Sequence, residues 1–194
     1  MSLASKLKGK NLIVASGSPR RQQFIKDLGL DFEIRLKSVS EDFPSSLSAV
    51  EIAEYLAKTK AQAFISELKS EDILITGDTI VWHENKVLNK PKDSNEAFKM
   101  LKSLSGKSHQ VISAACITSL EKSFLFHDVT KVYFNVLEDE EINYYINNFP
   151  PLDKAGAYGI QDWIGKIGIE KIEGSFYNVM GMPVAKVYNA LKEF

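Results

Sequence analysis

Apolar positions along this 194-residue chain form short runs and periodic stretches, and polar or glycine-containing segments separate them. The run at 12–15 predicts a short buried strand. A helix is expected over about 19–28, ending at Gly29, because glycine is favoured just after a helix C-terminus. Residues 31–39 then alternate apolar and polar side chains, which predicts a second strand with its apolar side chains on one face.

The middle of the chain shows a similar succession of helix and strand. A capping-box sequence at 48–51, Ser-Ala-Val-Glu, opens a predicted helix that runs to about Leu68. A continuous apolar run at 73–76 predicts a buried strand ending at Gly77-Asp78-Thr79. The apolar pattern nevertheless resumes after this tripeptide, so the strand is expected to continue to a turn near 84–86.

The rest of the chain predicts further elements in mixed order. These are a helix from Asp93 to about Gly106, an antiparallel hairpin over 110–120 and 124–136, a helix over 138–148, a strand over 164–172 and a final helix from about Met182. We find no repeat, low-complexity segment or linker. Helices and strands that mix throughout the chain indicate the α/β class with a mixed sheet.

Composition narrows the class of protein. Hydrophobic residues make up 44% and charged residues 25%, which is typical of a soluble globular protein of one large or two-lobed domain. The formal net charge of -1, without a block of basic residues, argues against a nucleic-acid partner. The apolar run near the N-terminus is too short for a signal peptide or a membrane span. The single cysteine, Cys116, is expected in the core, and a reducing cytoplasm is the expected location.

The sequence Ser16-Gly17-Ser18-Pro19-Arg20-Arg21 directly follows the first predicted strand. Ser18 has the side chain of a good N-cap, and Pro19 suits the first helical position. Free backbone N–H groups and two guanidinium groups would therefore converge at the positive end of a helix. Such a site suits a phosphate chain, although the same sequence also occurs as an ordinary solvated helix start.

Two acidic residues could carry chemistry. Asp78 follows a buried strand and a glycine, a position where open α/β sheets bind ligands, although an Asp after Gly also forms simple turns. Glu41 lies in the polar stretch after the second predicted strand, where a solvated loop acid is the ordinary alternative. If the two are close in space, they could hold Mg²⁺ or Mn²⁺, which prefer carboxylate and phosphate oxygens.

Further candidates lie on helices and loops. Lys60 belongs to the capped helix, where a surface lysine is the ordinary expectation, and Lys90 precedes a proline after the predicted hairpin. The segment 153–161 is rich in small residues that permit close approach of a ligand, and Gln161 could read a base edge. The segment 174–183 is a second tight region, for which a packed turn is as good an explanation as ligand contact.

Other common sites fit poorly. The three histidines, His83, His109 and His127, lack the spacing and cysteine companions of a metal site. The sequence Gly106-Lys107-Ser108 lacks the upstream glycine of a phosphate-binding P-loop and follows a helix instead of a strand.

Taken together, these blocks resemble the Maf family of nucleoside triphosphate pyrophosphatases, over nearly the whole chain and in the family order. The similar blocks are Ser16–Arg21, Glu41, Lys60-Ala61, Gly77–Thr79, Lys90-Pro91, 153–161 and 174–183. The resemblance implies a two-lobed α/β fold like that of Maf proteins and inosine triphosphatases. In it, helices flank a mixed sheet with a central cleft. A single domain over 1–194 and a homodimer are implied as well.

The resemblance also implies roles for individual residues. Asp78 matches the catalytic acidic residue, whose carboxylate accepts a proton from the attacking water. Ser16, Arg21, Glu41, Lys60 and Lys90 match the positions that hold phosphates and metal. A divalent ion would bridge Glu41 and Asp78, so Asp78 has two candidate roles, metal ligand and general base, which the sequence does not separate.

Arg20, Thr79 and Gln161 match the positions that separate subfamilies, and this set is that of the dTTP/UTP pyrophosphatases. Asp162-Trp163 departs from the glycine-rich sequence of many relatives, which leaves the shape of the pocket rim open. Two other functions remain possible: a nucleotide-binding regulator of cell division with incidental turnover, and a pyrophosphatase of the 7-methyl-GTP type.

Overall fold

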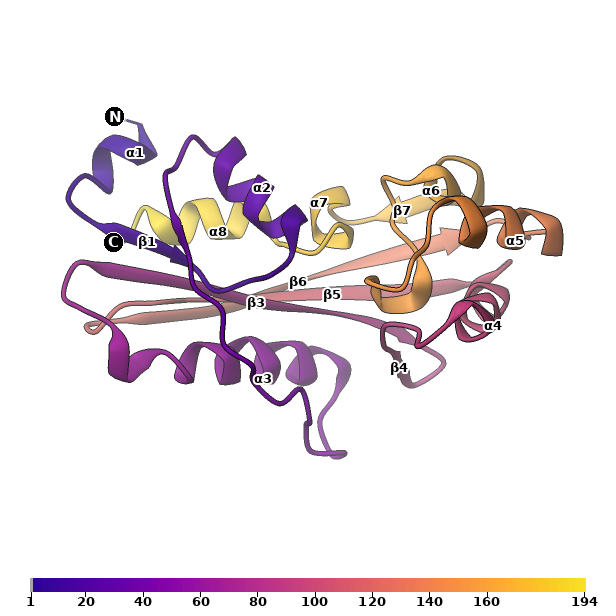
Figure 1. Cartoon of the computed structure of the whole chain (residues 1–194), viewed down its shortest axis with the longest axis horizontal. Coiled ribbons are helices and arrows are strands. Elements are labelled where there is room, and N and C mark those ends of the chain that lie inside the picture. The colour runs from indigo at the N-terminus through magenta and orange to yellow at the C-terminus, as the bar shows by residue number, and fades with distance from the viewer. Residues whose placement is uncertain (1) are drawn as a thin grey trace. The chain divides into compact units, whose positions relative to one another are not determined.

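The computed structural model describes residues 2–194 and contains a seven-stranded mixed sheet with helices (Figure 1). Its strands are β1 (Asn11–Val14), β2 (Glu33–Ile34), β3 (Asp72–His83), β4 (Lys86–Leu88), β5 (Ser108–Thr118), β6 (Ser123–Phe134) and β7 (Ile169–Glu173). The strand order is β2-β1-β3-β5-β6-β7, and β4 pairs with β3. β1 is parallel to β2 and β3, whereas the β3–β4 and β6–β7 pairs are antiparallel, so the predicted mixed sheet is confirmed.

Eight α-helices and two 3₁₀ turns are found among the described residues. They are α1 (Leu3–Lys6), α2 (Pro19–Asp27), α3 (Ala49–Gln62), η1 (Ile65–Glu67), α4 (Ser94–Leu104), α5 (Asp139–Asn148), η2 (Ala155–Ala157), α6 (Trp163–Gly168), α7 (Phe176–Val179) and α8 (Val184–Leu191). None of these helices has the length and apolar character needed to cross a membrane.

Capping residues explain several helix boundaries that the sequence predicted. Ser48 and Glu51 form the expected capping box at the start of α3. Asp93 caps α4 by accepting a hydrogen bond from the backbone N–H of Glu96 at 2.8 Å. Gly29, just beyond α2, has φ +72°, a value that favours glycine. These boundaries depend on neighbouring residues only, so the sequence was sufficient to place them.

The chain divides into two compact units, as expected for a two-lobed fold. Unit 1 comprises the described residues up to Asp78, Ser113–Asp128 and Gly181–Phe194, and unit 2 comprises Thr79–Ile112 and Val129–Met180. In unit 1, α2 and α8 cover one face of the sheet and α3 covers the other (Figure 1). The core of unit 2 consists of buried side chains from the sheet, α4, α5 and the segment from η2 to α6.

The predicted strand at 31–39 is largely wrong. Only Glu33–Ile34 pairs as a strand, β2, and it lies at the edge of the sheet beside β1. Ile34 is 47% exposed and Leu36 is 63% exposed, so the alternating pattern does not mark a buried face. Alternation alone cannot distinguish a covered strand from an edge segment that nothing covers.

Two other predicted boundaries need correction. α3 ends at Gln62, not near Leu68, and η1 follows it. The buried side chains of Phe64 and Leu68 are four residues apart, a spacing that imitates a continuing helix. The first half of the predicted strand at 164–172 is helix α6. There, a Cβ at Gly165 would lie 1.9 Å from the Ile160 carbonyl oxygen, so this tight turn depends on glycine.

Candidate functional site

The Lys60 ammonium group in unit 1 joins two carboxylates that the sequence selected separately. Lys60 Nζ lies 2.5 Å from Asp78 Oδ1 and 2.7 Å from Glu41 Oε1. The side chains of Lys60 and Asp78 are 19% and 13% exposed, whereas that of Glu41 is 60% exposed. The group is therefore a half-buried charge cluster that opens to solvent on the Glu41 side.

A contact between α3 and β3 explains why Lys60 reaches Asp78. The hydroxyl of Thr76 donates to the carbonyl oxygen of Ala57 at 2.8 Å and fixes this part of α3 on the strand. Thr76 and Asp78 are two residues apart in β3, so their side chains point to the same face. Ala57 and Lys60 are three residues apart in α3, so they lie on the same side of the helix. These two spacings bring the lysine to the aspartate.

β3 continues to His83, as the resumed apolar pattern predicted, so Asp78 lies within the strand and not at its end. The parallel pairing with β1 nevertheless stops before it. The last paired residues are Val14 and Ile75, and the Ala15 N–H donates to the Ile75 carbonyl oxygen at 2.9 Å. Asp78 thus lies just past the carboxyl end of β1, the edge where open α/β sheets bind ligands.

Gly77 and Arg21 fix the backbone beside Asp78. A Cβ at Gly77 would lie 2.8 Å from the carbonyl oxygen of Ala114, so only glycine permits this approach of β3 to β5. Arg21 Nη1 donates to the Gly77 carbonyl oxygen at 2.8 Å, and Arg21 Nε donates to the Gly181 carbonyl oxygen at 2.8 Å. Arg21 therefore joins two backbone segments, a contact that its predicted phosphate role did not include.

Burial lowers the pKa of the Arg21 guanidinium from its ordinary value, and the Asp78 carboxylate opposes this shift. The positive charge of Arg20 lowers the pKa further, and the Glu41 carboxylate raises it. An arginine remains charged in proteins in spite of such shifts. The Arg21 guanidinium is therefore under the electrostatic influence of Asp78, Arg20 and Glu41 within unit 1.

The loop from β1 to α2 is ordered by Ser16. Its hydroxyl accepts a hydrogen bond from the Ser18 N–H at 3.2 Å, and its carbonyl oxygen accepts one from Gln22 Nε2 at 2.8 Å. Ser18 occupies the N-cap position and Pro19 the first turn, as predicted, but the Ser18 side chain makes no capping hydrogen bond. Ser16 is thus the residue that shapes this helix start.

Three of the predicted site residues belong to unit 2. Thr79 follows Asp78 in β3 and is half-buried, and Lys90 is exposed just after β4. Near Lys90, the carbonyl oxygen of Asn89 accepts a hydrogen bond from the Gly156 N–H at 3.2 Å, which ties this loop to the segment 153–161. Gln161 is half-buried and borders an open, mainly apolar pocket of about 480 Å³.

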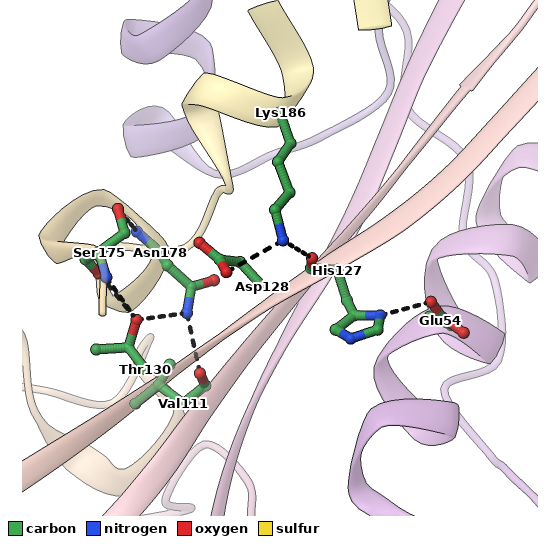
Figure 2. A network of polar contacts seen from close by, with 8 residues as sticks. All are labelled: Glu54, Val111, His127, Asp128, Thr130, Ser175, Asn178 and Lys186. Atoms are coloured by element: carbon green, nitrogen blue, oxygen red, sulfur yellow. Dashed lines mark hydrogen bonds and ion pairs between the residues drawn. The ribbon is translucent and has the colours of Figure 1, made fainter. Parts of the chain in front are cut away.

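Figure 2 shows two polar networks that the sequence did not reveal. In unit 1, His127 Nδ1 lies 2.7 Å from Glu54 on α3, and its carbonyl oxygen accepts from Lys186 on α8 at 2.6 Å. In unit 1, β6 is therefore hydrogen-bonded to a helix on each face of the sheet. In unit 2, the buried Asn178 amide donates to the Val111 carbonyl oxygen and to the Thr130 hydroxyl, both at 3.0 Å. This contact fixes the segment that begins at Gly174.

Two histidines that are distant in the sequence lie close together in unit 2. The ring centroids of His83 and His109 are 6.4 Å apart. His83 Nε2 lies 3.0 Å from the Ser103 carbonyl oxygen, and His109 Nε2 lies 2.7 Å from the Tyr158 hydroxyl. Burial, with a smaller effect of His83, lowers the pKa of His109 to about 3. Cys116 is buried, as predicted.

A divalent cation fits the donor set of the charge cluster only in part. Within residues 2–194, no group of three or more His, Cys, Asp or Glu side chains could hold a metal ion. Glu41 and Asp78 supply two carboxylates to one cation, the Lys60 ammonium group. Magnesium sites often use only one or two protein carboxylates and take their other ligands from substrate phosphates and water. The two acids therefore suit a metal that arrives with a phosphate-bearing substrate.

Comparison with known proteins identifies the family. The family model described as Maf-like protein matches residues 11–194. A dTTP/UTP pyrophosphatase of Flavobacterium johnsoniae is 58% identical over 97% of this chain and 97% of its own length. A dTTP/UTP pyrophosphatase of Bacteroides fragilis is 48% identical over 94% of this chain and 95% of its own length. Among solved structures, the Ham1 protein of Staphylococcus aureus aligns with 81% of this chain and 91% of its own at 16% identity and a TM-score of 0.49. The family match over residues 11–194 and the 58% and 48% identities to the two pyrophosphatases show that the chain belongs to the Maf-like protein family.

Proposed function

We propose that this protein is a nucleoside triphosphate pyrophosphatase that hydrolyses dTTP and UTP to the monophosphate and pyrophosphate. The observation that carries the proposal is the Lys60 ammonium group held between the Asp78 and Glu41 carboxylates. The names of the relatives, which are 46–58% identical, support the same reaction. Attack of water on a phosphate chain requires a proton acceptor, here a carboxylate, and fixed cations that stabilise the phosphate charge.

In the proposed reaction, water attacks the α-phosphorus. A new bond forms between phosphorus and the water oxygen, and the bond to the bridging oxygen breaks, so that pyrophosphate leaves with the electron pair. Asp78 accepts the proton of the attacking water. Lys60 donates a hydrogen bond to Oδ1 of Asp78 and so fixes the orientation of the carboxylate. The second carboxylate oxygen is then the proposed acceptor of the proton from water.

The proposed phosphate-binding residues are Ser16, Arg21, Lys60 and Lys90. Lysine supplies point charges, whereas the planar guanidinium of Arg21 can bind bidentately. Two of its five N–H groups already donate to Gly77 and Gly181, so Arg21 connects phosphate binding to the backbone beside Asp78.

We further propose Mg²⁺ or Mn²⁺ as cofactor, with Glu41 and Asp78 as the protein ligands. When bound, such an ion neutralises charge that develops on the phosphate oxygens. The proximity of both acids to one cationic group supports this assignment.

The proposed preference for dTTP and UTP rests on Arg20, Thr79 and Gln161, the three subfamily positions.

We also propose one functional domain over 1–194, of which Met1 is outside the described residues, and the family match over 11–194 supports this extent. A homodimer and a cytoplasmic location complete the proposal. The single, buried cysteine supports a reducing compartment, and sedimentation analysis would test the dimer.

The proposal is tested by hydrolysis in ¹⁸O-labelled water followed by mass analysis of the products. Attack at the α-phosphorus places the label in dTMP or UMP and leaves pyrophosphate unlabelled. Label in pyrophosphate, or release of single phosphates, would contradict the proposed reaction. Nucleotide binding without any product would favour a regulator instead.

A further inference from the structure

The Tyr145 hydroxyl links the two ends of the turn that carries Gln161. Tyr145 lies on α5 with no exposed surface. Its hydroxyl donates to Asp162 Oδ2 at 2.9 Å and accepts from the Gly159 N–H at 3.1 Å. The Asp162 N–H donates in turn to the Gly159 carbonyl oxygen at 3.0 Å. All these residues belong to unit 2, and Gln161 lies between the two that Tyr145 contacts.

The side chains of Gln161 and Asp162 both lie over Gly159. A Cβ at Gly159 would come within 2.5 Å of Asp162 Oδ2 and within 2.8 Å of Gln161 Nε2. The missing side chain thus provides the space that the carboxylate and the amide occupy together. A carboxylate favours the NH₂ end of a neighbouring amide over its oxygen end, because only the NH₂ end carries hydrogen-bond donors.

A lysine and a protonated tyrosine surround the Asp162 carboxylate. Lys154 Nζ, with a side chain only 13% exposed, lies 2.7 Å from Asp153 Oδ1 and 3.7 Å from Asp162 Oδ2, so its positive charge acts on both carboxylates. Burial is the main cause that raises the pKa of the Tyr145 hydroxyl above its ordinary value, and the nearby Asp162 carboxylate raises it further. The hydroxyl therefore keeps its proton at all physiological pH values and remains a donor to Asp162.

An amide held in one orientation has a specific use for a glutamine that reads pyrimidines. Uracil and thymine present an acceptor at O4 and a donor at N3, whereas cytosine presents a donor at N4 and an acceptor at N3. A glutamine amide pairs with either pattern if it can rotate by half a turn, because it has a donor and an acceptor side by side. Only an amide held in one orientation rejects cytosine.

We propose that Tyr145 and Asp162 are positioning residues that hold the Gln161 amide in one orientation and so make the site prefer UTP and dTTP over CTP. This inference rests on the proposed function, in which Gln161 reads the base.

The test measures hydrolysis of UTP and CTP mixed in one reaction, which gives the ratio of their kcat/KM values directly. The variants are Tyr145→Phe, Asp162→Ala and the double variant, with Tyr144→Phe, an exposed tyrosine on the same helix, as matched control. We expect the ratio to fall about fivefold in each single variant, the effect of one hydrogen bond, and little further in the double variant. The control Tyr144→Phe keeps the ratio of the wild-type protein.

A ratio is insensitive to partial unfolding, since loss of active protein lowers both rates equally. Asp162→Asn provides a second variant that keeps an acceptor for Tyr145, and it should retain more of the ratio than Asp162→Ala. An unchanged ratio in Tyr145→Phe, with wild-type protein active on UTP and a lower ratio in Gln161→Ala, would overturn the positioning role and leave the proposed function standing.

The side-chain amide resonances of Gln161, assigned by their loss in Gln161→Ala, give a readout without turnover. We expect them to shift in Tyr145→Phe and to stay in place in Tyr144→Phe. If wild-type protein hydrolyses no triphosphate, the proposed function fails and base selection fails with it. The amide resonances then decide alone whether the network holds Gln161, and unshifted signals in Tyr145→Phe would overturn that too.

Discussion

Lys60 Nζ lies 2.5 Å from Asp78 Oδ1, although the two residues are 18 positions apart and belong to a helix and a strand. The same ammonium group contacts Glu41 at 2.7 Å. One cation therefore compensates two carboxylates at the place where the proposed chemistry needs both a proton acceptor and bound phosphate. The predictions below separate the roles of these groups from those of the scaffold.

Replacing Asp78 by Asn removes the proposed proton acceptor and keeps the size of the side chain. We expect turnover of UTP and dTTP to fall by about 10²-fold or more, the usual effect of losing an essential acid–base group. Steady-state kinetics measure this, and thermal melting checks that the fold is retained. A fully active Asp78→Asn protein would refute the assignment.

Replacing Lys60 by Met keeps the length of the side chain but removes the charge. The two carboxylates then face each other without a cation, and we expect kcat/KM for UTP to fall by roughly 10- to 100-fold, in line with the loss of hydrogen bonds to charged groups. Lys58→Met is the matched control, because Lys58 is an exposed residue of the same helix. Equal activities of the two variants would show that Lys60 is an ordinary surface lysine.

Arg21→Lys tests the backbone contacts of the guanidinium group. A lysine cannot donate in two fixed directions, so the carbonyl groups of Gly77 and Gly181 lose at least one partner. We expect the free energy of unfolding in urea to fall by about 1.5–3 kcal/mol. Arg35→Lys, at a site where the guanidinium pairs with Glu33 and lies 3.7 Å from Asp72, keeps a positive charge for both carboxylates and should change it by at most about 1 kcal/mol. Arg21→Lys as stable as wild type would show that these contacts contribute little.

His109 predicts how stability depends on pH. Its pKa is lowered to about 3 in the folded chain, against an ordinary value of 6.5, so the unfolded chain binds a proton that the folded chain does not. Above pH 6.5 the ring is neutral in both the folded and the unfolded chain, and His109 does not lower the free energy of unfolding. As the pH falls from 6.5 toward 3, only the unfolded chain gains the proton, so the free energy of unfolding decreases. At about pH 5 the loss is about 2 kcal/mol.

His109→Gln, which keeps a partner for the Tyr158 hydroxyl, should therefore lose less stability than wild type between about pH 7.5 and about pH 5. Urea unfolding at the two pH values measures the difference, and His127→Gln serves as a control outside this cluster. If wild type and His109→Gln lose the same amount, the His109 ring does not resist protonation.

The sequence predicted what local chemistry determines. The capping box at Ser48 and the cap at Asp93 need only neighbouring residues, so both helix starts were found. The strand at 31–39 was overestimated because its exposure depends on the edge position beside β1, which alternation does not encode. Whether an apolar side chain is covered is decided by distant parts of the chain.

The candidate site shows the same division. Asp78, Lys60 and Glu41 were selected from their local settings and from the family resemblance, and the structure brings them together. The contact of Tyr145 with Asp162 joins a helix to a loop 17 residues further on. His83 and His109 lie close together although the whole of α4 separates them in the sequence. No local pattern marks such contacts, because they arise from packing.

The most direct test of the central claim is pyrophosphate release from a panel of nucleoside triphosphates, with Mg²⁺ or Mn²⁺ and with a chelator. We predict rapid, metal-dependent release from dTTP and UTP and little from 7-methyl-GTP. A preference for 7-methyl-GTP would contradict the subfamily assignment. Absence of pyrophosphate from every nucleotide, in protein shown to bind UTP, would contradict the proposed enzyme altogether.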